Sequence, residues 1–111
     1  MPKALVLPAA LVAAAALAIP ALAATKTVEV GDNYFVRDRG TPKVTVARGS
    51  AVKWVWKGNA PHNVTVTKGP KKFHSPTMKD GSYAKRFFTP GTYSIVCTIH
   101  LPNMKMTLVV K

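Results

Sequence analysis

The chain has 111 residues, of which 16 are Lys or Arg and four are Asp or Glu, so its formal net charge is +12. This length suits a single domain, and the positive charge favours acidic partners over basic ones. Lys and Arg are scattered along the sequence rather than gathered into a basic arm, which argues against nucleic-acid binding. The same scatter is typical of solvated strand faces in a small protein.

A charge-free, apolar segment at positions 4–24 follows Lys3 and includes Ala21-Leu22-Ala23. A basic start, an apolar middle and a small-x-small end are typical of a secretory signal peptide. We expect residues 1–23 to be removed on export and residues 24–111 to form the mature domain, in the periplasm or at the cell surface. A segment of this length can also span a bilayer, so an uncleaved N-terminal anchor is the alternative.

Cys97 is the single cysteine of the chain, so no disulfide can form within it. A domain of roughly 90 residues has a small core, and exported domains of this size often depend on disulfides or a metal ion. In an oxidising compartment, a lone cysteine is buried, pairs with another chain or binds a metal. This favours a metal site that includes Cys97.

Short segments of β type are separated by turns rich in Gly, Pro, Asn and Asp throughout residues 24–111. Their regular spacing predicts an all-β sandwich or barrel, and only the apolar N-terminal segment favours a helix. Residues 71–81 are expected to form a loop, and Phe87 and Phe88 cannot both face the core of a regular strand. Seven strands are expected, at residues 27–30, 43–47, 51–57, 63–67, 82–88, 92–97 and 104–110.

Four potential metal ligands stand out, namely His62 and the closely spaced Cys97, His100 and Met104. Two imidazoles, one thiolate and a weakly bound thioether form the donor set of blue-copper electron-transfer sites. His62, Cys97 and Met104 each share parity with apolar neighbours on their strands, so all three are expected to face the core at a strand end. His100 lies in the turn between Cys97 and Met104, where it can close the site from outside.

Other readings of these residues are less favoured. Met106 has the same parity as Met104 and is the rival sulfur ligand, with core packing as its default role. Zinc hydrolysis would need three stronger ligands and an open position for water, and no carboxylate lies near the motif to act as a base. Nucleophilic catalysis is disfavoured because Cys97 lies in an apolar strand with no evident oxyanion donor. We therefore expect no enzymatic activity, and we expect His74 to be a solvated loop residue.

The sequence of the expected mature domain resembles a cupredoxin of the plastocyanin and amicyanin type. This resemblance implies a Greek-key β-sandwich that holds one copper ion at one end. The ligands that it implies are His62, Cys97 and His100 in equatorial positions and Met104 in the axial one. The segments that resemble the family are residues 32–35, 54–56, 61–64, 90–93 and 97–104.

The resemblance also implies that Asn63 ties the two ligand loops together, with Thr98 as its hydrogen-bond partner. One feature departs from the family pattern, because the spacing here is Cys-x2-His-x3-Met. Amicyanins usually have two residues between His and Met, and plastocyanins have four. The reduction potential of either group therefore does not transfer to this chain.

We expect a small type 1 copper protein that carries single electrons by alternating between Cu(I) and Cu(II), with electrons entering and leaving through His100. Pro61, Leu101 and Pro102 would form an apolar rim for a transient, acidic redox partner. Peripheral association with an anionic membrane surface also fits the charge, and we expect a monomer. A copper chaperone, storage or resistance protein with the same ligands is the alternative function. A multicopper enzyme is disfavoured because the chain has only three His.

Overall fold

The computed structural model describes residues 24–36 and 41–111, so the expected signal peptide lies outside the described residues. This part of the chain is all-β, and it contains eight strands and no helix. In chain order the strands are β1 (Thr25–Gly31), β2 (Tyr34–Phe35), β3 (Lys43–Val46), β4 (Ala51–Trp56), β5 (Thr65–Lys68), β6 (Ser82–Arg86), β7 (Gly91–Val96) and β8 (Lys105–Val110). Across these same ranges, no helix has the length and apolar character needed to cross a membrane.

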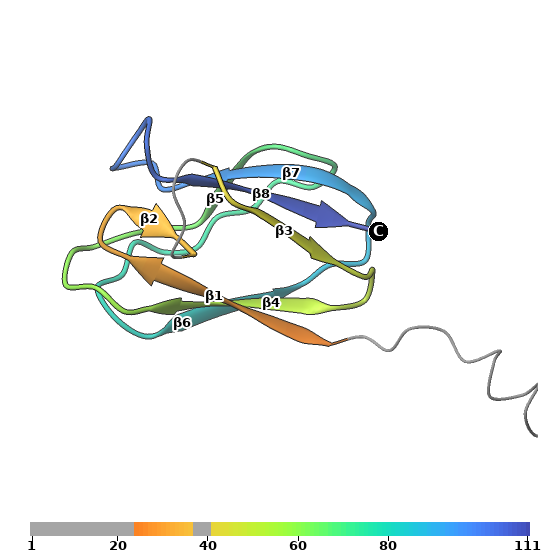
Figure 1. Ribbon diagram of the computed structural model, residues 1–111, viewed down its shortest axis with the longest axis horizontal. Helices are drawn as coiled ribbons and strands as arrows, with labels where there is room; N and C mark the ends of the chain where they lie inside the picture. The colour runs from red at the N-terminus through yellow and green to blue at the C-terminus, as the bar shows by residue number, and fades with distance from the viewer. Residues whose placement is uncertain (1–23, 37–40) are drawn as a thin grey trace, which may run out of the picture.

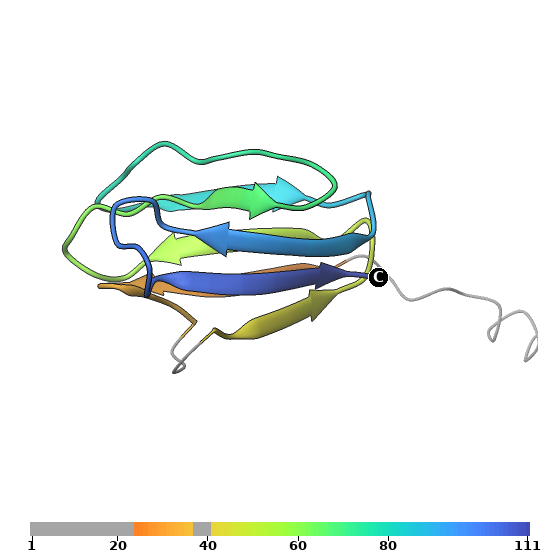
Figure 2. The same cartoon turned by 90° about the horizontal axis from the view of Figure 1, so that it is seen from above.

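The strands form two four-stranded sheets that pack face to face, as Figures 1 and 2 show. One sheet has the order β2-β1-β4-β6 and the other has the order β3-β8-β7-β5. Strands β1 and β4 run parallel, as do β3 and β8, while the remaining neighbours are antiparallel. Neighbouring strands that are distant in sequence require crossovers between the sheets, and the expected β-sandwich is confirmed.

Alternation of apolar and polar residues explains which face of each strand is buried. In β8, Met106, Leu108 and Val110 are buried, whereas Lys105 is exposed. The same pattern holds in β3, β4 and β7, because side chains two apart in a strand lie on one face of the sheet. The two inner faces therefore supply one continuous apolar core, with the fully buried Trp54 among its largest side chains.

Each of the seven expected strands corresponds to an observed one, with ends that differ by at most two residues. Strand β2 was not expected, because two residues are too few to show a period. The segment 71–81 holds no strand of its own, and it lies beside β5 through two isolated bridges, His62 with Met78 and Thr65 with His74. Phe87 is buried and Phe88 is 69% exposed, as the sequence required.

Three connections meet at one end of the sandwich, on the left of Figure 1. They are the β1–β2 turn, the loop between β4 and β5, and the loop between β7 and β8. The last two of these loops contain the four expected ligands. The C-terminus and the β6–β7 turn lie at the opposite end.

Candidate metal centre

Three of the expected ligands converge on one point. The Nδ1 atoms of His62 and His100 lie 3.2 Å apart, and Cys97 Sγ lies 3.3 Å from Nδ1 of His100 and 3.9 Å from Nδ1 of His62. A point equidistant from the three atoms lies roughly 2.0 Å from each, which is close to the metal–nitrogen and metal–sulfur bond lengths of about 2.0 to 2.3 Å known for zinc sites. The trio is the only group of three or more His, Cys, Asp or Glu with metal-binding spacing in the described ranges.

Backbone hydrogen bonds hold each of these side chains in place. His62 exchanges two of them with Met78, at 2.9 and 3.0 Å, which fixes the loop after β4 against the segment 71–81. The N–H of Cys97 donates to the carbonyl of Met104, and the N–H of His100 donates to the carbonyl of Cys97. The ligands are therefore set by main-chain geometry rather than by long, free side chains.

The register of β7 and β8 separates Met104 from its rival Met106. Cys97 N–H bonds to the carbonyl of Met104 at 3.0 Å, while Met106 pairs with Ile95, two pairs deeper in the sheet. Residues directly opposite in antiparallel strands have Cβ atoms about 5 Å apart and lie on the same face. Both methionines are buried, but Met104 is the one directly opposite Cys97.

Asn63 joins the two ligand loops, as the resemblance implied. Its Oδ1 accepts the N–H of Thr98 at 3.1 Å and the hydroxyl of Thr65 at 2.8 Å. Its Nδ2 donates to the hydroxyls of Thr98 and Thr77 at 2.9 and 3.2 Å. The backbone N–H of Asn63 points at Cys97 Sγ at 3.5 Å, and such a bond tunes the potential of a thiolate-bound metal.

The second nitrogen of His62 contacts a residue to which sequence reasoning gave no role. Oδ1 of Asp32, in the β1–β2 turn, lies 3.0 Å from His62 Nε2. The same carboxylate accepts the backbone N–H groups of Asn59 and Ala60 at 2.9 to 3.0 Å. Those two backbone donors, followed by the His62 ring, lower the pKa of Asp32 from 3.8 to about 2. The only sequence signal was that Asp32 opens a segment resembling the family.

Exposure differs sharply among the ligands. His62 and Cys97 have no exposed surface, whereas His100 is half-buried. Leu101 is 57% exposed, and Pro102, which follows it, and Pro61, which precedes His62, are exposed as well, as the expected apolar rim requires. The remaining histidine, His74, is exposed and lies outside the ligand group.

This donor set fits copper better than other metals. Imidazole suits both Cu(I) and Cu(II), and thiolate and thioether are soft donors that favour Cu(I). The Trp56 indole donates to the carbonyl of His62 at 3.2 Å, which steadies the buried imidazole from the core side. A site with these donors on a β framework can hold one ion in a single geometry.

Comparison with known proteins supports this assignment. The family model for copper-binding proteins of the plastocyanin/azurin family matches residues 24–111. The chain is 37% identical to amicyanin-alpha of Methylorubrum extorquens, over 93% of this chain and 92% of that protein. It is 32% identical to plastocyanin of Prochlorothrix hollandica, over 75% of this chain and 70% of that one.

Solved structures of amicyanin point mutants have the same fold. One of them, in the Cu(I) form, matches with a TM-score of 0.66 and 30% identity, covering 86% of this chain and 89% of that one. Another, in the oxidised form, matches with a TM-score of 0.65 and 28% identity, covering 78% of this chain and 82% of that one. The chain therefore belongs to the plastocyanin/azurin family of copper-binding proteins and is a cupredoxin for a single copper ion.

Proposed function

We propose that this cupredoxin is an exported one-electron carrier, with His62, Cys97 and His100 as equatorial ligands and Met104 as the axial ligand. The observation that supports it best is the convergence of two Nδ1 atoms and one Sγ atom within 3.9 Å of one another. Bound copper would supply the Cu(I)/Cu(II) couple. Substrate turnover has no place in this proposal, since two of the three donor side chains are fully buried.

The residues around the ligands suit electron transfer because they keep the donor atoms in one arrangement. Asn63 bonds both ligand loops, and the Cys97–Met104 backbone bond ties β7 to β8. A framework that does not rearrange between two oxidation states keeps the cost of each electron transfer low. The same framework would oppose ready exchange of the metal.

Electrons would enter and leave at the half-buried edge of His100. This is the only one of the three converging ligands with exposed surface. Leu101 and Ile99, which are 57% and 50% exposed, flank it with apolar surface. Transient redox complexes use small patches, below about 1,200 Å², so a rim of this kind is sufficient.

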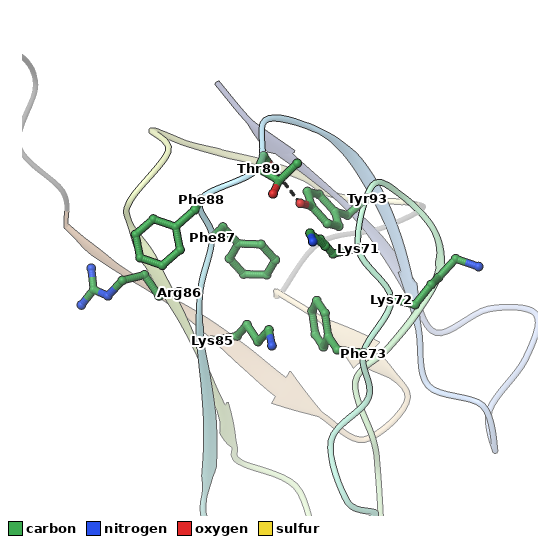
Figure 3. A pocket seen from close by; sticks show the side chains of 9 residues that line it. All are labelled: Lys71, Lys72, Phe73, Lys85, Arg86, Phe87, Phe88, Thr89 and Tyr93. Atoms are coloured by element: carbon green, nitrogen blue, oxygen red, sulfur yellow. Dashed lines mark hydrogen bonds between the residues drawn. The ribbon is translucent and has the colours of Figure 1, made fainter.

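The partner in this proposal carries an acidic surface. A basic hollow with a volume of about 430 Å³ lies beside β6, and none of the four expected ligands lines it. Figure 3 shows the side chains that line it. The side chains of Lys71 and Lys85 point into it, and Lys85 Nζ lies 5.2 Å above the ring of Phe73. The lining residues include four cations and no acid; they are Lys71, Lys72, Phe73, Lys85, Arg86, Phe87, Phe88, Thr89 and Tyr93.

Charge reversal tests whether this hollow helps to attract an acidic partner. A Lys71→Glu/Lys85→Glu double variant should bind a polyglutamate peptide more weakly at low salt and lose most of the salt dependence of binding. A matched Lys53→Glu/Lys57→Glu variant changes two exposed positions in and just after β4, and it should retain more of the peptide binding and of its salt dependence. Equal losses of peptide binding in the two double variants would mean that net charge, and not the hollow, attracts the partner. Preferential binding of the wild-type chain to anionic vesicles would indicate a membrane surface instead.

Export rests on the sequence pattern of residues 1–23. In this proposal the mature chain begins at residue 24 and works as a monomer in the periplasm or at the cell surface. Mass spectrometry of the chain recovered from the producing cell would give the mass of residues 24–111. The mass of the full chain in a membrane fraction would instead indicate the anchored form.

Addition of Cu(II) to the purified chain tests the central proposal. We expect an intense blue colour that Cys97→Ala abolishes, because the colour of such sites arises from the copper–thiolate bond. Voltammetry should show a fast, reversible one-electron couple with one copper per chain. A colourless or green product would contradict the type 1 site, and rapid surrender of copper to a chelator would favour copper handling over electron carriage.

A further inference from the structure

Both ring nitrogens of His62 have polar neighbours. Its Nδ1 faces Cys97 and His100, while its Nε2 lies 3.0 Å from Oδ1 of Asp32. His62 has no exposed surface, so water cannot serve as the partner of Nε2. A buried ring with two different neighbours is held in one orientation and one tautomer, since the hydrogen bond at one nitrogen decides where the proton resides.

The loop between β4 and β5 is built to receive this carboxylate. Asn59 and Ala60 donate their backbone N–H groups to Asp32, so three donors surround its two oxygens. Gly58 leaves the necessary space, because a Cβ at this position would lie 2.1 Å from Oδ1 of Asp32. The turn that presents Asp32 also has a special residue, Asn33, whose φ of 75° lies in the left-handed region that Asn tolerates.

Two backbone bonds alone would make Asp32 a loop anchor with no effect on the metal site. The third contact changes this, because it places a negative charge on the far side of a ligand ring. A carboxylate that accepts the outer N–H of a metal-bound imidazole raises the basicity of the ligand and orients the ring. A more basic ligand stabilises Cu(II) more than Cu(I).

We propose that Asp32 is a positioning residue of the copper site, which fixes His62 with its proton on Nε2 and lowers the reduction potential of the bound copper. Its effect on the potential rests on the proposed one-electron function. Its effect on the ring does not, since the Asp32–His62 contact joins two side chains of the protein itself. The two effects can therefore be tested separately.

The first test uses the metal-free full chain and ¹⁵N NMR of the histidine rings. We expect the wild-type ring of His62 to be protonated at Nε2 alone. Asp32→Ala should give a mixture of both tautomers, and Asp80→Asn, which removes the same charge from an exposed aspartate in another loop, should leave the ring unchanged. A wild-type pattern in Asp32→Ala would overturn the positioning role.

The second test measures the reduction potential of the copper-loaded chain. Loss of an outer partner of a metal ligand costs roughly 10- to 100-fold in affinity. If Asp32→Asn weakens Cu(II) binding about tenfold more than Cu(I) binding, the potential rises by about 59 mV for a one-electron couple. Asp80→Asn should stay near the wild-type potential, because it leaves the His62 contact intact.

Gly58→Ala provides a variant that keeps the charge of Asp32 but displaces its carboxylate. It should raise the potential in the same direction as Asp32→Asn. Unchanged reduction potentials in both variants would overturn the proposed role of Asp32. A wild-type chain with no reversible redox couple would instead overturn the one-electron function, and the NMR test would then decide the role of Asp32. If Asp32→Ala fails to fold, Asp32→Ser, whose side chain is too short to reach Nε2 of His62, takes its place in the NMR test under the same criterion.

Discussion

Cys97 and Met104 lie opposite each other where β7 and β8 separate, joined by a backbone hydrogen bond of 3.0 Å from the cysteine N–H to the methionine carbonyl. This bond closes the loop that contains His100, whose N–H and carbonyl bond back to Cys97 and Met104 respectively. The Cys-x2-His-x3-Met segment thus forms a compact turn at the end of the β7–β8 pair. The register places Met104 opposite Cys97 and leaves Met106 two pairs deeper in the sheet.

Replacing Met104 by Leu should raise the reduction potential and change the visible spectrum, because the axial thioether is one of the features that tune such sites. Met106→Leu is the matched control, since both residues are buried and both changes conserve volume. Each variant should lose less than about 1.5 kcal/mol of unfolding free energy without metal. A spectral change in Met106→Leu but not in Met104→Leu would reverse the assignment.

Asn63→Ala should destabilise the metal-free protein by about 1 to 3 kcal/mol, because it removes the hydrogen bonds by which the buried Asn63 side chain joins the two ligand loops. Thr98 is the most affected, as it both donates to Asn63 and accepts from it. Urea unfolding followed by tryptophan fluorescence measures the loss. Asn103→Ala, at an exposed position in the other ligand loop, should change stability by less than about 0.5 kcal/mol. Equal effects of the two variants would contradict the bridging role of Asn63.

Local alternation was sufficient to predict most strands and the inward direction of three ligands. The faces that hold His62, Cys97 and Met104 follow from a period of two, and all three are buried as expected. The convergence of His62 with Cys97 was expected from the donor set, because parity alone does not place two strands beside each other. The structure supplies that contact at 3.9 Å.

The features that sequence reasoning missed are those set by contacts between distant segments. Asp32 lies thirty positions before His62, and only the fold brings the β1–β2 turn to the ring. In the sequence, Gly58 looks like an ordinary turn glycine, and only the structure shows that it makes room for the Asp32 carboxylate. Strand β2 is defined by pairing of Val30 with Phe35 rather than by any pattern of its own.

The lowered pKa of Asp32 predicts a specific pH dependence of stability. The folded-state pKa is about 2 and the ordinary value is 3.8, so the ionised carboxylate stabilises the fold above pH 4. That stabilisation is lost as the pH falls from about 4 to about 2. The difference in urea midpoint between metal-free wild type and Asp32→Asn should shrink over this range, while a constant difference would mean that the carboxylate charge is not involved.

Leu101→Glu should slow electron transfer while leaving the copper spectrum intact, because Leu101 lies on the exposed rim beside His100 and is not a ligand. The added charge would repel an anionic oxidant such as hexacyanoferrate(III) at the electron-transfer edge. Stopped-flow oxidation of the reduced protein should be roughly tenfold slower at low ionic strength, and the difference should narrow as salt screens the charge.

Thr45→Glu is the matched control for this experiment, since it adds the same charge to an exposed position of β3. It should slow the reaction only slightly, through the small change in total charge. Equal slowing by the two substitutions would show that total charge rather than the His100 edge governs the rate. An altered spectrum in Leu101→Glu would mean that the rim supports the ligand geometry, and the rate could then no longer be attributed to the route of the electron.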